Sequence, residues 1–203
     1  MNDVEIVSVH YKTPDLIYTQ YNSIRNFYPD LPYRIIDGSD NGVKYFDDLE
    51  KKDKSFIVER FGYNIHHGPG MDYAIRNSKY KYLFILDSDV CLKKKVIEHL
   101  FDNFKGYSVG KLIKVDLTGH ENWQKKQSDP NSFIYTYVHP YCMLINKNEY
   151  LRYKPFKKHG APCIDAMVDL YNNKKTDMLN GVVIEDYVDL KIRGTRSVWG
   201  INL

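Results

Sequence analysis

A run of apolar and aromatic residues that ends in two carboxylates is the feature that most constrains the fold of this 203-residue chain. Residues 80–86 have the sequence YKYLFIL, and Asp87, Ser88 and Asp89 follow directly. The short length and the abundance of strand-forming residues predict a buried strand. Alternation along the extended backbone places Asp87 and Asp89 on one side and Ser88 on the other. Carboxylates this close repel each other unless a cation or a shared proton lies between them.

Two interpretations of this strand end are open from the residues alone. A hard divalent cation such as Mg²⁺ or Mn²⁺ suits paired carboxylates and also binds phosphates. A solvated turn or the N-cap of a helix has the same residue types. The hypothesis of a metal-bound diphosphate therefore depends on the rest of the chain.

Strand-like and helix-like segments alternate through the first half of the chain. Turn and capping residues separate them, including Thr13-Pro14 before a helix and the polar run at 37–42. The alternation predicts an α/β fold with a mainly parallel sheet, right-handed crossovers and helices on both faces. Ligands of such sheets bind beyond the carboxyl ends of the strands. The expected strands of this half cover residues 4–9, 33–36, 56–58 and 80–86.

The second half adds strands at 108–115, 135–145 and 182–184 and helices that begin near Lys147 and Pro162. The strand at 135–145 is interrupted by His139-Pro140, because proline has no N–H to donate to a sheet. The sequence contains no repeat, linker or low-complexity tract. We therefore expect one domain over residues 1–203.

Composition excludes several classes of protein. The net charge of +3 does not favour nucleic acid as a ligand. Cys91, Cys142 and Cys163 are widely spaced, so neither a disulfide framework nor a zinc site is expected. No apolar run approaches the roughly 20 residues that span a bilayer, and the acidic start is unlike a signal peptide. These features predict a soluble cytoplasmic protein of undetermined oligomeric state.

Four segments, in their order and separations, resemble GT-A glycosyltransferases of the inverting family-2 type. They are residues 6–14 (IVSVHYKTP), 35–39 (IIDGS), the Asp87-Ser88-Asp89 segment, and Gly160-Ala161-Pro162 with Asp165 downstream. The small size is also similar to that of compact viral members of the superfamily, which would place the chain in a host cytoplasm. The resemblance implies a single GT-A (Rossmann-like) domain with a smaller acceptor-side sheet. Its nucleotide-sugar-binding half would cover about residues 1–105 and its acceptor-binding half about 106–203.

The resemblance also implies an activity, the metal-dependent transfer of a sugar from a UDP-sugar to an acceptor hydroxyl, with inversion. Glucose is the default donor sugar, and the acceptor would be a glycan or glycoprotein. Tyr11, Thr13 and Pro14 would line the uracil pocket. Asp37 would accept a charge-assisted hydrogen bond from uracil N3–H, which selects uracil over cytosine. The alternative for Asp37 is a turn residue bonded to nearby backbone.

The family's Asp-x-Asp residues hold the donor through a metal. By this resemblance Asp89 is a direct ligand of Mn²⁺ or Mg²⁺, and Asp87 binds the metal or the ribose, with Ser88 between them at the donor. The metal would neutralise the diphosphate as UDP leaves. The family's general base, which takes the proton of the acceptor hydroxyl, corresponds to Asp165, with Asp169 as its rival one turn later.

The chain departs from the family in two places. The loop before the central strand lacks an arginine, so its donor contact would pass to Arg76, to His66 or His67, or to N–H groups at the Gly-rich helix start. No histidine stands near the end of the chain, where relatives place a metal or diphosphate ligand. The candidates there are Asp189 for the metal and Arg193 and Arg196 for phosphate.

Aromatic side chains in the second half are candidates for the acceptor pocket. Trp123 and Tyr141 offer ring faces that suit sugar C–H surfaces, and His139 lies between them in sequence. A buried aromatic core explains the two aromatic residues equally well.

Two other functions remain open. In a haloacid-dehalogenase-like phosphatase, Asp87 would be the nucleophile and Asp89 the acid/base, but that motif normally lies on the first strand. It also carries threonine or valine where this chain has Cys91. A non-catalytic sugar-nucleotide-binding module would keep the Asp-x-Asp site and lose the base, so Asp165 counts against it.

Overall fold

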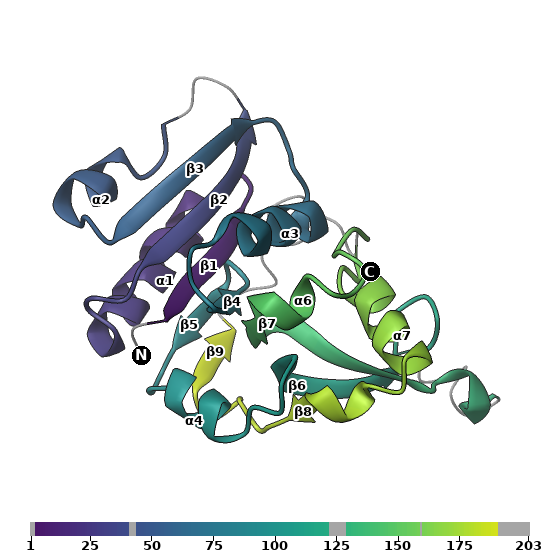
Figure 1. Ribbon diagram of the computed structural model, residues 1–203. Helices are drawn as coiled ribbons and strands as arrows, with labels where there is room; N and C mark the ends of the chain where they lie inside the picture. Colours follow the sequence, from purple (N-terminus) through teal and green to yellow (C-terminus); the bar gives the residue numbers. More distant parts are fainter. Residues whose placement is uncertain (1–2, 41–43, 122–128, 159, 191–203) are drawn as a thin grey trace.

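The computed structural model describes residues 3–40, 44–121, 129–158 and 160–190. In this part of the chain a seven-stranded sheet has the order β3-β2-β1-β4-β7-β6-β8, and β5 and β9 form a second sheet (Figure 1). The strands of the large sheet are β1 (Val4–His10), β2 (Tyr33–Asp40), β3 (Phe56–Gly62), β4 (Tyr82–Leu86), β6 (Ser108–Val115), β7 (Tyr135–Asn146) and β8 (Leu179–Gly181). The small sheet pairs β5 (Val90–Leu92) with β9 (Val188–Leu190) in antiparallel fashion.

The first four strands of the large sheet run parallel. β1 pairs with β2 and β4, and β2 pairs with β3, all in parallel register. β7 is antiparallel to both β4 and β6, while β8 is parallel to β6. The expected α/β fold with a mainly parallel sheet and a smaller second sheet is therefore confirmed. As a consequence, the carboxyl ends of β1, β2 and β4 lie at one edge of the sheet.

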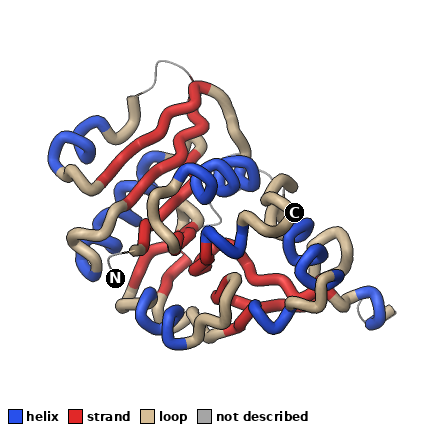
Figure 2. The backbone as a smooth tube through the Cα atoms, viewed as in Figure 1, coloured by secondary structure: helices blue, strands red, loops and turns tan. Residues whose placement is uncertain are grey.

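Alternating apolar residues explain why helices cover both faces of the sheet (Figure 2). On β4, Phe84 and Leu86 face one core, and Leu83 and Ile85 face the other. The first core contains residues of α1 (Pro14–Phe27), α2 (Asp47–Lys52) and α4 (Ile97–Asp102). The second contains residues of α3 (His67–Asn77), α6 (Lys147–Tyr150) and α7 (Ile164–Asn172). Short 3₁₀ turns, η1 (Pro130–Ser132) and η2 (Thr176–Met178), complete the described elements.

Two local expectations from the sequence were wrong. β2 continues through the expected turn to Asp40, because its backbone still pairs with β3 across a register shift between Asp37 and Asp40. The expected strand at 182–184 is absent from the described chain, where β8 ends before it and β9 begins after it. Its buried residue, Ile184, packs in the first core and accepts turn hydrogen bonds from the N–H groups of Tyr187 and Val188.

β7 contains a bulge where the sequence predicted an interruption. Gly110 pairs with Met143 and the next residue of β6 pairs with His139, so residues 140–142 have no partner on β6. A Cβ on Gly110 would lie 2.6 Å from the carbonyl oxygen of Cys142, which explains why glycine stands there. The bulge turns the carbonyl of Tyr141 toward β4, where it accepts a 3.0 Å hydrogen bond from the Asp87 N–H. The central strand end is thereby tied to the second half of the chain.

The described residues contain no helix that is long and apolar enough to cross a membrane. All three cysteines are buried and free of disulfides, as expected from their spacing.

Candidate active site

Acidic side chains gather where the parallel strands end. Thr13 follows β1, Asp37 lies in the last half of β2, and the Asp87-Ser88-Asp89 segment follows β4. Because these three strands are neighbours in the order β2-β1-β4, their ends lie side by side. The structure thus brings the expected base-binding and metal-binding residues to one edge of the sheet.

Asp37 is held by a buried hydrogen-bond network. Its Oδ1 atom lies 2.9 Å from His10 Nδ1 and accepts a second bond, also 2.9 Å, from the Ser39 N–H. The Thr13 N–H donates to His10 Nε2 at 2.9 Å, so the ring proton is on Nδ1 and the histidine is neutral. Burial raises the pKa of Asp37, but the bonds from His10 and Ser39 outweigh burial and hold the pKa below its ordinary value. The β1 end and the β2 end are therefore locked together through one carboxylate oxygen.

This network predicts a pH dependence of folding stability. Because the pKa of Asp37 is lower in the folded chain, its contribution is fully present above the unfolded pKa of about 4 and is lost as the pH falls toward the folded pKa. Asp37→Asn should lower the free energy of unfolding by about 2 kcal/mol at neutral pH. Urea titrations should show this difference shrinking below about pH 4. A difference that stays constant between neutral and acid pH would contradict the role of the charged form.

The backbone of the Asp87-Ser88-Asp89 segment forms a tight turn. The Val90 N–H donates to the Asp87 carbonyl at 3.0 Å, which closes the turn before β5 begins. Gln20 of α1 donates from Nε2 to the carbonyls of Asp87 at 2.7 Å and Val90 at 2.9 Å. The sequence reasoning missed Gln20, although a polar residue between Ile17 and Ile24 on the apolar side of a helix was a usable signal.

Two histidines flank Asp87. His67 Nε2, at the first residue of α3, lies 3.0 Å from Asp87 Oδ1. Burial lowers the pKa of His67, but the charge of Asp87 outweighs it and the pKa lies above its ordinary value. Burial also lowers the pKa of His139, which is within electrostatic reach of Asp87. The Tyr141 N–H donates to His139 Nδ1 at 3.3 Å, so in the neutral ring the proton is on Nε2.

The donor atoms at this turn fit a divalent cation. Asp87 Oδ1 is buried and pairs with His67 Nε2, but it accepts no hydrogen bond of good geometry from the described residues. Such an unsatisfied carboxylate oxygen suits Mg²⁺ or Mn²⁺. Within the described ranges, no three or more His, Cys, Asp or Glu side chains form a complete metal cage. Phosphate oxygens of a ligand would therefore have to complete the coordination, as is common for Mg²⁺.

The start of α7 lies close enough to Asp87 for their charges to interact. Burial raises the pKa of the Cys163 thiol far above its ordinary value, and the negative charge of Asp87 raises it further. Asp165 follows Cys163 in the first turn of α7, is half-buried, and receives no hydrogen bond from the described residues. The Asp165 carboxylate is therefore not engaged by another described residue.

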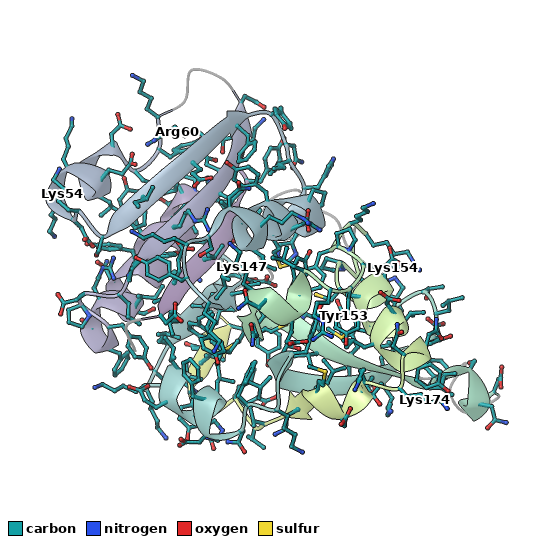
Figure 3. The ribbon with its side chains drawn as sticks, viewed as in Figure 1. Lys54, Arg60, Lys147, Tyr153, Lys154 and Lys174 are labelled. Atoms are coloured by element: carbon teal, nitrogen blue, oxygen red, sulfur yellow. The ribbon has the colours of Figure 1, made fainter. Side chains whose placement is uncertain are left out.

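Asp169, the rival to Asp165, has a structural task. Its Oδ2 accepts the backbone N–H of Lys154 at 3.1 Å, and its Oδ1 lies 3.3 Å from the Asn173 amide nitrogen. Lys154 is labelled beside α7 in Figure 3. These bonds tie the segment before α7 to the middle of the helix, so the Asp169 carboxylate is engaged by the protein itself.

The structure removes Arg76 from the candidate site. Arg76 lies in the last turn of α3, nine residues after His67, which corresponds to about 13 Å along the helix. Its side chain is 43% exposed and pairs with Asp72 at 2.8 Å. The first turn of α3 lies at the site instead, where Gly70 packs against β1: a Cβ there would lie 2.9 Å from Val9. Of the donor-contact candidates, His67 and the start of α3 therefore lie beside Asp87, and Arg76 does not.

The remaining candidates are divided. Asp189 of β9 pairs with Cys91 of β5. Because Cys91 lies two residues after Asp89, Asp189 is close to the Asp87-Ser88-Asp89 turn. His139 and Tyr141 lie on the β7 bulge beside Asp87. Tyr11 and Pro14 flank Thr13 at the end of β1, and Ser88 is half-buried in the turn. The candidates that lie outside the described residues are Trp123, Arg193 and Arg196.

The mostly parallel sheet, with acidic side chains at the carboxyl ends of its strands, defines a GT-A domain. The chain belongs to the family described as Glycosyl transferase family 2, which matches residues 6–171. The sequence-based recognition of this family is thereby confirmed. No curated protein matches the chain in sequence.

Solved structures share the fold at low sequence identity. A mannosyltransferase from Pyrobaculum calidifontis in complex with GDP-Man and Mn²⁺ is 13% identical, with a TM-score of 0.67 over 97% of this chain. S. aureus TarS 1-349 is 14% identical, with a TM-score of 0.62 over 92% of this chain. The same TarS fragment in complex with UDP-GlcNAc is 10% identical, with a TM-score of 0.60 over 92%. The chain spans 59% of the first two of these structures and 57% of the third.

Proposed function

We propose that this chain transfers a sugar from a UDP-sugar to an acceptor hydroxyl, with inversion, and depends on Mn²⁺ or Mg²⁺. The observation that carries the proposal is the convergence of Asp37 and the Asp87-Ser88-Asp89 turn at one edge of a GT-A sheet. Membership of glycosyl transferase family 2 supports it. In the same proposal, the donor binds the first half of the domain and a glycan or glycoprotein acceptor binds the second.

The geometry of Asp37 favours uracil over guanine. Guanine presents two adjacent donors, N1–H and N2–H, which pair best with both oxygens of a carboxylate, whereas uracil presents N3–H alone. Asp37 Oδ1 already accepts from His10 and Ser39, so one oxygen remains for a base. A single acceptor satisfies uracil and leaves a guanine donor unpaired, which costs binding energy. UDP is therefore the favoured nucleotide, although one similar structure holds GDP-Man and another holds UDP-GlcNAc.

The diphosphate would lie between the turn and the start of α3. Asp89 and Asp87 would hold the cation, which supplies Lewis-acid neutralisation of the leaving UDP. His67 and the N–H groups of the first turn of α3 would contact phosphate oxygens from the other side. Asp165 would then take the proton of the acceptor hydroxyl on the opposite face of the sugar.

A nucleotide comparison tests the donor class. In thermal-shift titrations with Mn²⁺, UDP at 100 times its Kd should stabilise the chain by about 2.7 kcal/mol, or roughly 5–10 °C in Tm. We expect UDP to bind at least about tenfold more tightly than GDP, the equivalent of one hydrogen bond of 1.4 kcal/mol. Tighter binding of GDP would reassign the base, and no response to either nucleotide would overturn the donor function.

A second measurement separates an enzyme from a non-catalytic binding module. A transferase with a bound metal and a general base should slowly release UDP from a cognate UDP-sugar even without an acceptor. The panel should include UDP-glucose as the default, with UDP-GlcNAc and UDP-galactose. Tight UDP binding without release from any sugar would favour the binding module.

A further inference from the structure

One polar residue on the buried, apolar side of helix α1 has no role in the chemistry described so far. Gln20 is fully buried there, yet it belongs to a helix face formed otherwise by Ile17, Tyr21 and Ile24. A buried amide is costly unless all of its hydrogen-bonding groups are satisfied. Its partners therefore explain why glutamine stands at this position.

The two ends of the Gln20 amide contact different parts of the fold. Oε1 accepts from the Ser8 hydroxyl of β1 at 2.9 Å and from the Tyr33 hydroxyl of β2 at 2.5 Å. Nε2 donates to the carbonyls of Asp87 and Val90, the first and last residues of the proposed metal-binding turn. Because carbonyls only accept and these hydroxyls donate, the orientation of the amide is fixed.

A second residue of α1, Ser23, lies about one helical turn after Gln20 and also bonds to the backbone that follows Asp87. The hydroxyl of Ser23 accepts the Leu92 N–H of β5 at 3.0 Å and donates to the Gln20 carbonyl at 2.7 Å. On the opposite side of the turn, the Asp87 N–H is held by the carbonyl of Tyr141. The backbone from Asp87 to Leu92 is thus hydrogen-bonded to α1 on one side and to the β7 bulge on the other.

We propose that Gln20 is a positioning residue of the donor site, which fixes the direction of the Asp87 and Asp89 side chains by holding the carbonyls at both ends of their turn. The expected effect of Gln20 on UDP and Mn²⁺ binding rests on the proposed function. Its effect on the conformation of the turn does not. Gln20 is fully buried, so it does not reach the donor site directly. It acts through the backbone, since the direction of each Cβ follows from the turn conformation.

Gln20→Glu tests this with little change of shape. The carboxylate keeps an acceptor for Ser8 and Tyr33 but directs an oxygen, in place of the NH₂ group, at the two turn carbonyls. Gln20→Met, which is uncharged and of similar length, serves as the second variant if the glutamate variant does not fold. The matched control is Tyr33→Phe, which removes a bond from the other end of the same amide and leaves the turn bonds in place.

The first readout is hydrogen exchange of the peptide that contains residues 87–92. In this peptide the Asp87 N–H donates to the Tyr141 carbonyl, the Val90 N–H donates to the Asp87 carbonyl within the turn, and the Leu92 N–H donates to the Ser23 hydroxyl. In Gln20→Glu we expect these amides to exchange on the order of tenfold faster, and in Tyr33→Phe to exchange as in wild type. Unchanged hydrogen exchange in both Gln20→Glu and Gln20→Met, or an equal increase in Tyr33→Phe, would overturn the proposal.

The second readout is the gain in UDP affinity that Mn²⁺ provides over EDTA. A merely structural role would weaken UDP binding equally with and without metal, whereas a turn that misdirects Asp87 and Asp89 loses the metal-dependent gain. We expect that gain to fall about tenfold in Gln20→Glu and to remain within twofold in Tyr33→Phe. An unchanged gain in Gln20→Glu would overturn the positioning role. If wild type shows no gain, the proposed function fails, and hydrogen exchange still decides whether Gln20 fixes the turn.

Discussion

Asp89→Ala is expected to abolish the Mn²⁺-dependent stabilisation of the chain by UDP. Asp87 and Asp89 belong to the same short turn, and Asp87 Oδ1 is buried without a hydrogen bond of good geometry. No complete metal cage exists among the described residues, so in the proposed site a cation would depend on these carboxylates and on the donor phosphates. Losing one of two protein ligands should remove most of the roughly 2.7 kcal/mol that saturating UDP provides. Thermal-shift titration with Mn²⁺ measures this directly.

The control for Asp89→Ala is Asp177→Ala, which removes an exposed carboxylate from η2, an element adjoining β8 rather than β4. The control should keep the full response to UDP with Mn²⁺, and wild type in EDTA should behave like Asp89→Ala. Stabilisation by UDP that persists unchanged in EDTA would contradict the metal-bridged site. Stabilisation that requires Mn²⁺ but survives Asp89→Ala would move the ligand role to Asp87 or Asp189.

The architecture and the edge that carries the site were predictable because they depend on local patterns. Alternation within β4, where even-numbered and odd-numbered residues enter different cores, follows from the strand period of two. The carboxylate pair at the end of β4 could also be recognised from the sequence, because Asp87 and Asp89 directly follow the strand. Since parallel strands end at one edge, Asp37 and Asp89 could be placed together without any knowledge of tertiary contacts.

The parts that could not be predicted depend on residues distant in sequence. Gln20 and Asp87 are 67 positions apart, and only the packing of α1 on β5 brings them together. The β7 bulge was visible as an interruption, but its contact with Asp87 was not. Arg76 is different, because a crossover helix runs antiparallel to its strands and its last turn must lie at the far edge. That rule would have selected His67 over Arg76 from the sequence.

Asp165→Asn is expected to lower sugar transfer about 100- to 10,000-fold, the usual contribution of a general base. UDP affinity with Mn²⁺ should stay within about twofold, because Asp165 belongs to α7 and the proposed nucleotide contacts belong to β1, β2, the turn and the start of α3. Steady-state kinetics with the donor identified by the UDP-sugar panel, together with UDP titration, separates the two effects.

The matched control is Asp169→Asn, one turn later on the same helix. Asp169 holds the Lys154 N–H, so its amide variant should lose about 1 kcal/mol of stability and retain transfer. The two variants make the same chemical change on one helix and should differ in which property they lose, because Asp165 receives no hydrogen bond from the described residues, whereas Asp169 accepts the Lys154 N–H. An active Asp165→Asn protein would exclude Asp165 as the base, and a simultaneous loss of transfer in Asp169→Asn would assign that role to its rival.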